Sequence, residues 1–430
     1  MTTSALTGSE AQASRPVAPA PHYGVRAAVA RRLFARAASR LPVTIAHGPG
    51  TELPVAAPRG PAAPSGRPVM RIVRPAAFFA RLGDGGLIGF GESYMAGDWD
   101  ADDLPGVLTA FAAHLPALVP APLQRLRRLA VRPRPDADDG GAEGARRNVA
   151  HHYDLFNQLF ALFLDETMTY SAALFEQQPD GTLTGDLAAA QHRKIDRLLD
   201  LAGVGPGTRL LEIGTGWGEL ALRAGRRGAY VRSLTLSAEQ RDLAWVPIAR
   251  AGLADRVRVQ LRDYRDADGV HDAVISVEMI EAVGMRHWPE YFAVLHRLLA
   301  PGGRAALQAI TMPNDRMLAS RDTHTWIEKY IFPGGMLPST EAIEGCAAAA
   351  GLRSAAPSPD GRLRFGPHYA ETLRRWRERF LAAGPEVAGL GFDPVFCRMW
   401  VFYLAYSQAG FAAGYLDVQQ FLLTRSEDLR

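Results

Sequence analysis

Short apolar runs alternate with helical patterns through the second half of the chain. Four runs lie at residues 209–213, 231–236, 271–277 and 304–310. Residues 252–259 lead into another, which is the third in chain order. Such runs are typical of strands buried in a parallel sheet. Strands that alternate with helices predict an α/β fold with a doubly wound, mostly parallel sheet, in which ligands bind at the carboxyl ends of the strands.

A glycine turn directly follows the first of these strands. Gly214, Gly216 and Gly218 precede a helix start, and glycine there lets a ligand approach the backbone closely. We expect Glu212, at the strand end, to reach a ribose hydroxyl or an amino group. A G-x-G-x-G turn alone also fits an ordinary strand-to-helix connection. The spacing is not the G-x-G-x-x-G of dinucleotide sites, and no lysine follows as in a P-loop, so the turn favours S-adenosylmethionine.

Further residues after the second and third strands extend the predicted crevice. Thr235, Leu236 and Gln240 follow the second strand, and Asp263 and Tyr264 follow the third. The order of strands, turns and polar ends is that of a class I methyltransferase.

The stretches around this sheet predict helices and a lid. An aromatic amphipathic helix is expected at residues 151–160, and long helices at 369–383 and 394–423. An insertion at 311–338 would form a lid over an apolar substrate. Its aromatic residues are Trp326, Tyr330 and Phe332. Such a cluster is more often part of a core than a gate for lipid.

The first third of the chain predicts a small α/β domain. Short strands are expected at residues 42–46 and 69–73, and a glycine-rich stretch at 85–97 predicts a tightly packed bend. The expected organisation is a disordered leader at 1–22, an N-terminal lipid-binding-like domain at 23–134, a linker at 135–147 and a methyltransferase domain at 148–430.

Charge is unevenly distributed along the chain. The net charge is +3, but residues 1–150 carry +6 because 18 arginines face 12 acids there. One arginine cluster lies in an Ala-rich helical stretch at residues 26–40, and a second at 125–134. A basic amphipathic helix suits a membrane surface, while a solvated face is an equally good interpretation. No nucleic-acid-binding signature accompanies the arginines.

The cysteine content indicates the cellular compartment. Cys346 and Cys397 are far apart, which argues against a disulfide scaffold or a zinc site and favours a reducing cytoplasm. No apolar run is long enough to span a bilayer. His151 and His152 lack metal-ligand spacing, so no metal site is expected.

Several motifs occur in one order from residue 148 to residue 425. They are H-Y-D at 152–154, M-T-Y-S at 168–171, L-E-I-G-T-G-W-G at 211–218, D-Y-R-D at 263–266, I-F-P-G-G at 331–335 and P-H-Y at 367–369. With them the sequence resembles the cyclopropane-fatty-acid synthase family, including the mycolic acid cyclopropane synthases. G-E-S-Y-M at 91–95 extends the resemblance to the N-terminal domain. E-M-I-E-A-V-G at 278–284 and Q-A-I-T-M-P at 308–313 look most like the actinobacterial fatty-acid methyltransferases of tuberculostearic acid synthesis.

The resemblance implies both a cofactor site and a base. Contacts with S-adenosylmethionine would fall on Tyr170, Ser171, Gly214, Gly216, Thr235, Leu236, Gln240 and Tyr264. It also implies a bicarbonate ion near the alkene, held in the family by a glutamate, two tyrosines, a histidine, a cysteine and a backbone amide. Here the glutamate is Glu281 and the tyrosines are Tyr153 and Tyr369. The histidine position is Gln308 and the cysteine position is Ala172, so the binding of the ion stays open.

The chemistry implied is methylation of a cis double bond in an unsaturated acyl chain of a membrane phospholipid. Methyl transfer leaves a carbocation, which Glu281 and the tyrosines could stabilise in a site that excludes water. Proton loss with ring closure gives a cyclopropane, and a hydride shift before proton loss gives an exocyclic methylene. Because Ala172 and Gln308 depart from the cyclopropane-forming pattern, we expect the 10-methylene product, which a separate reductase would convert to a methyl branch.

Other interpretations stay open at this stage. Glu281 could cap a helix, Tyr153 and Tyr369 could be core tyrosines, and Gln308 could close backbone hydrogen bonds. The product could be a cyclopropane, the substrate a soluble small molecule, or the chain a lipid-binding protein with a relic fold. The expected location is the cytoplasm, peripheral to the inner face of the membrane. The sequence does not decide whether the chain forms a homo-oligomer.

Overall fold

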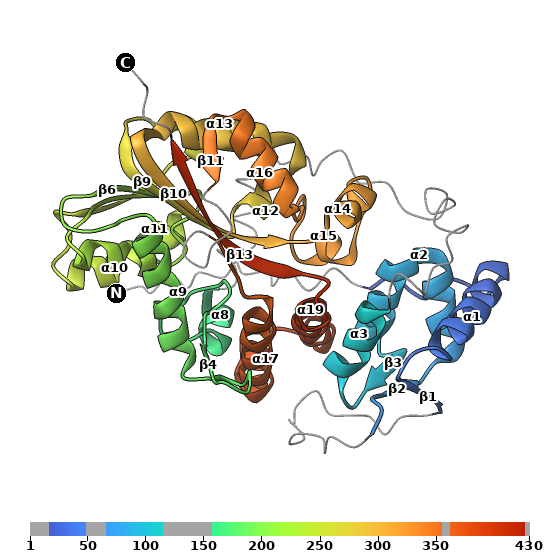
Figure 1. The fold of residues 1–430 in the computed structure, drawn as a ribbon. Helices are drawn as coiled ribbons and strands as arrows, with labels where there is room; N and C mark the ends of the chain where they lie inside the picture. The colour runs from blue at the N-terminus through green and yellow to red at the C-terminus, as the bar shows by residue number, and fades with distance from the viewer. Residues whose placement is uncertain (1–16, 49–65, 115–156, 355–361, 426–430) are drawn as a thin grey trace, which may run out of the picture.

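A computed structural model describes residues 17–48, 66–114, 157–354 and 362–425 (Figure 1). The N-terminal region, in blue, lies beside a larger unit built on one long sheet. Parts of the expected organisation fall outside the described residues: most of the leader, the whole linker at 135–147, the arginine cluster at 125–134, and Tyr153.

The large sheet has the strand order β11-β13-β10-β9-β6-β7-β8. Its parallel part confirms the expected doubly wound α/β fold. The parallel strands are β6 (Arg209–Ile213), β7 (Tyr230–Thr235), β8 (Val257–Leu261), β9 (His271–Val277) and β10 (Leu299–Thr311). Antiparallel to β10 runs β13 (Asp417–Arg425), with which the short strands β11 (Leu352–Ser354) and β12 (Arg362–Arg364) pair.

Alternate side chains of the strands enter two separate apolar cores. Leu210 and Ile275 belong to one core with the helices α9 (Leu187–Leu201), α10 (Glu219–Arg226) and α11 (Ala238–Arg250). Leu211 and Val274 belong to the other, with α13 (Trp288–Leu298) and α16 (Thr340–Ala349). Because successive side chains of a strand point to opposite faces, these two sets of helices cover the two faces of the sheet.

The end of the chain differs from the expectation of one helix over residues 394–423. The helix α19 (Pro394–Ala412) ends early, Gly414 adopts a left-handed φ of 66°, and the chain returns as β13. The run after the glycine is apolar and buried, with Val418, Phe421 and Leu423 at 0–1% exposure. It therefore completes the sheet beside β10 rather than extending the helix. The other long helix is confirmed as α17 (Gly366–Ala382), which packs against α19.

The N-terminal region is the expected small α/β unit. A sheet of β1 (Thr44–His47), β2 (Val69–Ile72) and β3 (Trp99–Ala101) is joined by α1 (Val25–Ala38), α2 (Pro75–Met95) and α3 (Leu104–Ala113). The glycine-rich stretch lies inside α2 and kinks it at Gly86, where φ is 55°. A side chain at Gly89 would lie only 1.9 Å from a backbone oxygen of Arg81, so the predicted tight bend is confirmed.

The N-terminal region and the large unit share one apolar core. Helices α2 and α3 pack on α19, and Tyr94 lies 5.4 Å from Phe402, ring centroid to ring centroid. Arg398 of α19 donates to the backbone oxygen of Tyr94 and forms an ion pair with Asp100 at 3.1 Å. The two parts are therefore held together by a shared apolar core and by the contacts of Arg398.

The insertion at 311–338 folds over α19 and touches the N-terminal region. It contains α14 (Asn314–Ser320) and α15 (Trp326–Tyr330). The Trp326 ring lies 4.8 Å from that of Phe402, and a side chain at Gly91 of α2 would lie 2.5 Å from the indole. Glu92 of α2 accepts from the Tyr330 hydroxyl at 2.9 Å and pairs with Lys329. The insertion is thus anchored on the N-terminal region, and its role as a lid stays a prediction.

Candidate active site

The glycine turn joins β6 to α10 in a conformation that favours glycine. Gly214, Gly216 and Gly218 have φ values of 95°, 54° and 94°. A side chain at Gly218 would lie 2.7 Å from the methyl group of Ala244, so this glycine permits close helix packing. A side chain at Gly216 would meet nothing within 4 Å. Gly216 therefore faces open space where a ligand can approach the backbone.

Glu212 lies beneath this turn, with 3% of its surface exposed. Its carboxylate accepts a hydrogen bond from Ser233 Oγ at 2.5 Å, and Ser233 in turn contacts Thr215 Oγ1 at 2.6 Å. Burial raises the pKa of Glu212 to about 8. Hydrogen bonds through Ser233 therefore connect the Glu212 side chain to Thr215 in the turn. Its contact with a ribose hydroxyl or an amino group stays a prediction.

The other expected cofactor residues lie at the ends of β7 and β8. Thr235 Oγ1 donates to the side-chain oxygen of Gln240 in α11 at 2.8 Å, and Leu236 lies between β7 and α11. Asp263 is 2% exposed and binds the Arg265 guanidinium at 2.7 Å, while the Tyr264 ring packs edge-on against Tyr291. These residues lie along one edge of the sheet, as the sequence predicts.

Tyr170 and Ser171 lie on a loop held by α9. Gln191 Nε2 donates to the backbone oxygen of Ser171 at 2.9 Å, and Lys194 Nζ donates to its hydroxyl at 2.5 Å. Tyr170 stacks on Trp376, and its hydroxyl lies 2.6 Å from that of Tyr403. Hydrogen bonds from α9 therefore hold the loop at Ser171, and aromatic residues pack against it at Tyr170.

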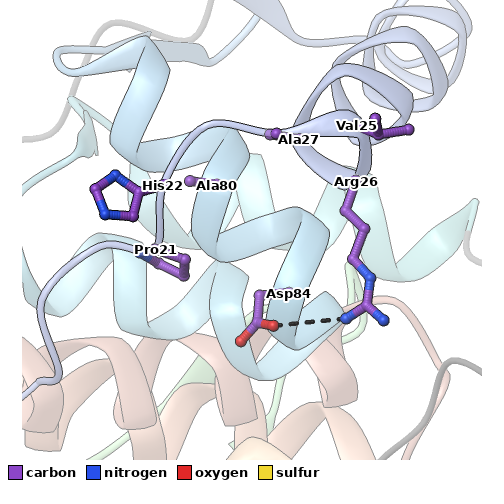
Figure 2. Close-up of a pocket in the computed structure, with 8 residues that line it drawn as sticks. Pro21, His22, Val25, Arg26, Ala27, Ala80 and Asp84 are labelled. Carbon is purple, nitrogen blue, oxygen red and sulfur yellow. Dashed lines mark ion pairs between the residues drawn. The ribbon is translucent and has the colours of Figure 1, made fainter.

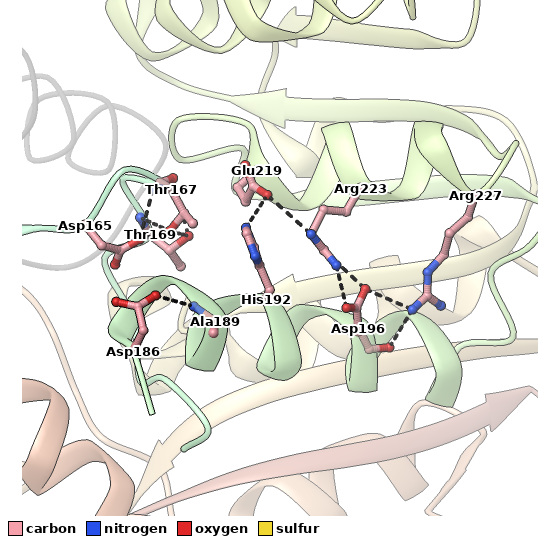
Figure 3. A network of polar contacts seen from close by, with 10 residues as sticks. All are labelled: Asp165, Thr167, Thr169, Asp186, Ala189, His192, Asp196, Glu219, Arg223 and Arg227. Atoms are coloured by element: carbon pink, nitrogen blue, oxygen red, sulfur yellow. Dashed lines mark hydrogen bonds and ion pairs between the residues drawn. The ribbon is translucent and has the colours of Figure 1, made fainter. Parts of the chain in front are cut away.

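Ion pairs hold α9 against the helix that begins at the glycine turn (Figure 3). His192 contacts Glu219 at 3.0 Å, and Asp196 binds both Arg223 and Arg227, at 2.5 and 3.0 Å. The loop carrying Tyr170 and the glycine turn are consequently fixed relative to each other.

Sequence reasoning missed a second acidic residue, Glu278, which lies at the end of β9. One carboxylate oxygen accepts from the backbone N–H of Ala172 at 2.9 Å and from Gln308 Nε2 at 2.8 Å. The other accepts from the Tyr369 hydroxyl at 2.8 Å. Burial raises the pKa of Glu278, and the buried Lys194 opposes this rise. The signal available in the sequence was a carboxylate at a strand end, three residues before Glu281.

Glu281 lies one turn further on, in α12 (Ile280–Val283). One of its oxygens accepts from the backbone N–H of Ile310 at 2.5 Å. The other is buried and has no hydrogen-bond partner among the described residues. Burial and the nearby negative charge of Glu278 raise the pKa of Glu281 to about 8. An uncompensated buried oxygen of this kind is a site where a cation would be stabilised.

The expected residues Glu281, Gln308 and Tyr369 thus gather around Glu278. Met279 joins this cluster to the cofactor turn, because a side chain at Gly214 would lie 2.8 Å from the Met279 side chain. The cluster is built from the residue that follows β9, from α12, from β10 and from α17. The structure therefore places the carboxylates next to the glycine turn.

Three further features of the described residues concern metal binding, membrane spanning and a surface pocket. No group of three or more His, Cys, Asp and Glu side chains is arranged to hold a metal ion, and no described helix is both long and apolar enough to cross a bilayer. A shallow pocket of about 200 Å³ lies at the start of α1 (Figure 2). It is lined partly by Arg26 and Asp84, whose charged groups are 3.7 Å apart, and it lies outside the cluster around Glu278.

The sheet order, the glycine turn and the residues at the strand ends define a class I S-adenosylmethionine-dependent methyltransferase. The family model for mycolic acid cyclopropane synthetase matches residues 142–421, and the chain belongs to this family.

Its relatives include proteins of similar length and shorter ones. The chain is 54% identical over 409 residues to the tuberculostearic acid methyltransferase UfaA1 of Mycobacterium tuberculosis, covering 94% of this chain and 93% of the relative. It is 34% identical over 355 residues to the cyclopropane-fatty-acyl-phospholipid synthase of Escherichia coli K12, covering 81% and 86%. The structure of mycolic acid cyclopropane synthase CmaA1 complexed with SAH and CTAB aligns with a TM-score of 0.58 at 33% identity, covering 65% of this chain and 98% of that one.

Proposed function

We propose that the chain methylates the cis double bond of unsaturated acyl chains in membrane phospholipids and yields a 10-methylene acyl product. The observation that carries the proposal is the similarity to a tuberculostearic acid methyltransferase over 94% of the chain. The cluster of Glu278, Glu281 and Tyr369 beside the glycine turn supports it, because a carbocation formed there would favour the ionised form of these buried carboxyl groups and be stabilised by it.

S-adenosylmethionine supplies an electrophilic methyl group when it is bound. Gly214, Gly216 and Gly218 would allow its close approach, and Gln240, Asp263 and Tyr264 would position its nucleoside. Tyr170 would form an aromatic wall beside it.

Glu281 would stabilise the positive charge that methyl transfer leaves on the acyl chain. Its unpartnered oxygen offers a lone pair, and a neighbouring positive charge would favour the ionised carboxylate. The lid residues would exclude water, which would otherwise add to the cation. Tyr153 lies outside the described residues, and its role as a second tyrosine at this site remains part of the proposal.

The groups that the family resemblance assigns to bicarbonate do not fit that ion here. The amide of Ala172, the side chain of Gln308 and the hydroxyl of Tyr369 all donate to Glu278 instead. Their hydrogen-bonding capacity is used by a carboxylate of the chain itself. No step of the proposed reaction is therefore assigned to bicarbonate.

Helix α1 supports the peripheral membrane association that we include in the proposal. Val25, Val29 and Leu33 recur every four residues on α1 and are 81%, 50% and 47% exposed. Exposed arginines accompany this stripe: Arg26, Arg31, Arg32, Arg36 and Arg40. Apolar residues that enter the headgroup boundary beside cations are typical of helices that lie on anionic bilayers. We place the chain at the inner face of the membrane; a separate reductase would complete the methyl branch.

The test is a reaction of the purified full chain with methyl-labelled cofactor and vesicles of oleoyl phospholipid. Exomethylene and cyclopropane products have equal mass, so vinylidene proton signals or ozonolysis must tell them apart. We expect vinylidene signals to dominate, and a dominant cyclopropane would contradict the product assignment. Labelling of soluble small molecules but not of acyl chains would contradict the substrate assignment.

Glu281→Gln should stop turnover while leaving cofactor binding intact, since it removes the carboxylate beside the cation. The measurement pairs calorimetric titration of the cofactor with label transfer to acyl chains. Turnover by Glu281→Gln at the parent rate would contradict the role given to Glu281.

A further inference from the structure

The carboxylate of Glu278 is held by donors from three separate parts of the fold. They are the backbone of the loop at Ala172, the side chain of Gln308 in β10, and the hydroxyl of Tyr369 in α17, at 2.8–2.9 Å. Such a concentration of donors specifies the position of an anion closely. In this chain the anion is a side chain and is permanently present.

The direction of the hydrogen bond from Gln308 is fixed by a chain of amides. Arg197, which can only donate, binds Oε1 of Gln420 at 2.6 Å. Nε2 of Gln420 therefore points to Oε1 of Gln308, at 3.0 Å, and Nε2 of Gln308 points to Glu278. Together with the N–H of Ala172, this leaves one oxygen of Glu278 as an acceptor of two fixed donors.

The second oxygen of Glu278 has a partner that can change roles. A tyrosine hydroxyl donates to a carboxylate, and it can turn to accept from a carboxylic acid. The contact with Tyr369 therefore survives in either protonation state of this oxygen. Lys194, fully buried against Ser171, provides a compensating positive charge for the ionised state.

The backbone conformation of Glu278 is unusual for a glutamate. Glu278 has φ of 50°, and among the described non-glycine residues only Met168 shares a positive φ. Glycine adopts this conformation without strain, and a glutamate there is unfavourable unless its surroundings hold it. Glu278 as a whole residue is intermediate in exposure, whereas Ala172, Gln308 and Tyr369 are buried.

We infer that Glu278 is the base of the reaction, a built-in carboxylate that takes the place of an external anion. The inference rests on the proposed function. After the hydride shift, a C–H bond of the transferred methyl group breaks and its electron pair forms the exocyclic C=C bond. The proton passes to the oxygen of Glu278 that faces Tyr369, and the carboxylate becomes a carboxylic acid. Release of that proton to water restores the ionised base before the next turnover.

The first measurement uses the unmodified chain. Label transfer to oleoyl phospholipid is followed in buffer freed of carbon dioxide, and again with added bicarbonate. We expect equal rates, because the base belongs to the chain. A rate that collapses without bicarbonate and returns with it would overturn the inference while leaving the proposed function intact. A chain that methylates no acyl group in either buffer would overturn both.

The second measurement uses Glu278→Gly, which suits the local backbone and opens a space among the three donors. We expect acyl methylation to fall roughly 100-fold, and added formate or bicarbonate to restore it in a saturable manner. Cofactor affinity by calorimetry should stay within about twofold, since Glu278 does not build the nucleoside site. Parent-like turnover without any added anion would overturn the inference.

Two further variants provide the controls. Glu278→Gln keeps the volume and loses the base, so it should lose activity without rescue by formate; if it binds the cofactor and turns over at the parent rate, the inference is overturned. Glu344→Gln removes a partly exposed carboxylate that pairs with Arg362 at 2.7 Å. It should retain the parent rate in every buffer. Because the first measurement needs no variant, misfolding of Glu278→Gly would not leave the inference without a test.

Discussion

Glu212→Gln should make the free energy of unfolding depend less on pH between pH 5.5 and pH 8. The carboxyl group is buried beneath the glycine turn, and its pKa rises from 4.5 to about 8 on folding. A folded-state pKa above the unfolded value means that the folded protein binds more protons between these two values. Stability contributed by the neutral acid is therefore present at low pH and is lost as the pH rises toward and through 8.

The magnitude follows from the two pKa values. Each pKa unit corresponds to about 1.4 kcal/mol, and between pH 5.5 and pH 8 the cost of keeping Glu212 buried rises by about 3 kcal/mol. Glutamine keeps the shape and can still accept from Ser233, but it does not ionise. The difference in unfolding free energy, variant minus parent, should therefore increase by about 3 kcal/mol over this pH range.

Urea unfolding without cofactor, followed by tryptophan fluorescence at both pH values, measures this difference. Glu386→Gln, at an exposed position, is the matched control and should show no comparable change between the two pH values. A difference for Glu212→Gln that is the same at pH 5.5 and pH 8 would refute the reasoning, because it would mean that the folded state binds no extra proton at Glu212.

Three further predictions concern the cofactor turn, the membrane surface and the lid. Gly216→Val should abolish cofactor binding in a calorimetric titration, because φ is 54° and the added side chain would enter the open space beside the turn; unchanged affinity would remove this assignment. Changing Arg31, Arg32 and Arg36 to Glu should weaken cosedimentation with anionic vesicles, at about 1 kcal/mol per residue, without altering cofactor affinity. Equal sedimentation would show that these arginines are only a solvated face. Gly91→Ala should lower thermal stability, because the added carbon would lie 2.5 Å from the lid indole and overpacking costs about 1–3 kcal/mol; an unchanged melting temperature would mean that the lid contact is loose.

The sequence predicted the parts of the fold that have strong local signals. The apolar strands, the glycine turn and the positions after β7 and β8 follow from patterns a few residues long, and they occupy the expected edge of the sheet. The strand β13 was missed because its apolar run follows a helix directly, and only pairing with β10, more than a hundred residues away, decides its conformation.

Glu278 was missed for a related reason. In sequence it is one of two acids at a strand end, and Glu281 matched the family pattern. Its function depends on donors from Ala172, Gln308 and Tyr369, which only the folded chain brings together. Local patterns identify where strands end and which residues line that edge, whereas the partners of a buried carboxylate depend on the packing of distant elements.

The core shared by the N-terminal region and α19 restricts how chains of this family can differ in length. CmaA1 corresponds to 65% of this chain, so a comparable short enzyme must present another surface where Phe402 and Trp326 are here 1% and 3% exposed. Cutting this chain at residue 135 would uncover those rings and remove α2, whose Gly91 packs against the Trp326 indole, so the fragment should aggregate rather than act as a small enzyme. A member of the family without the N-terminal region therefore needs a different surface on α19.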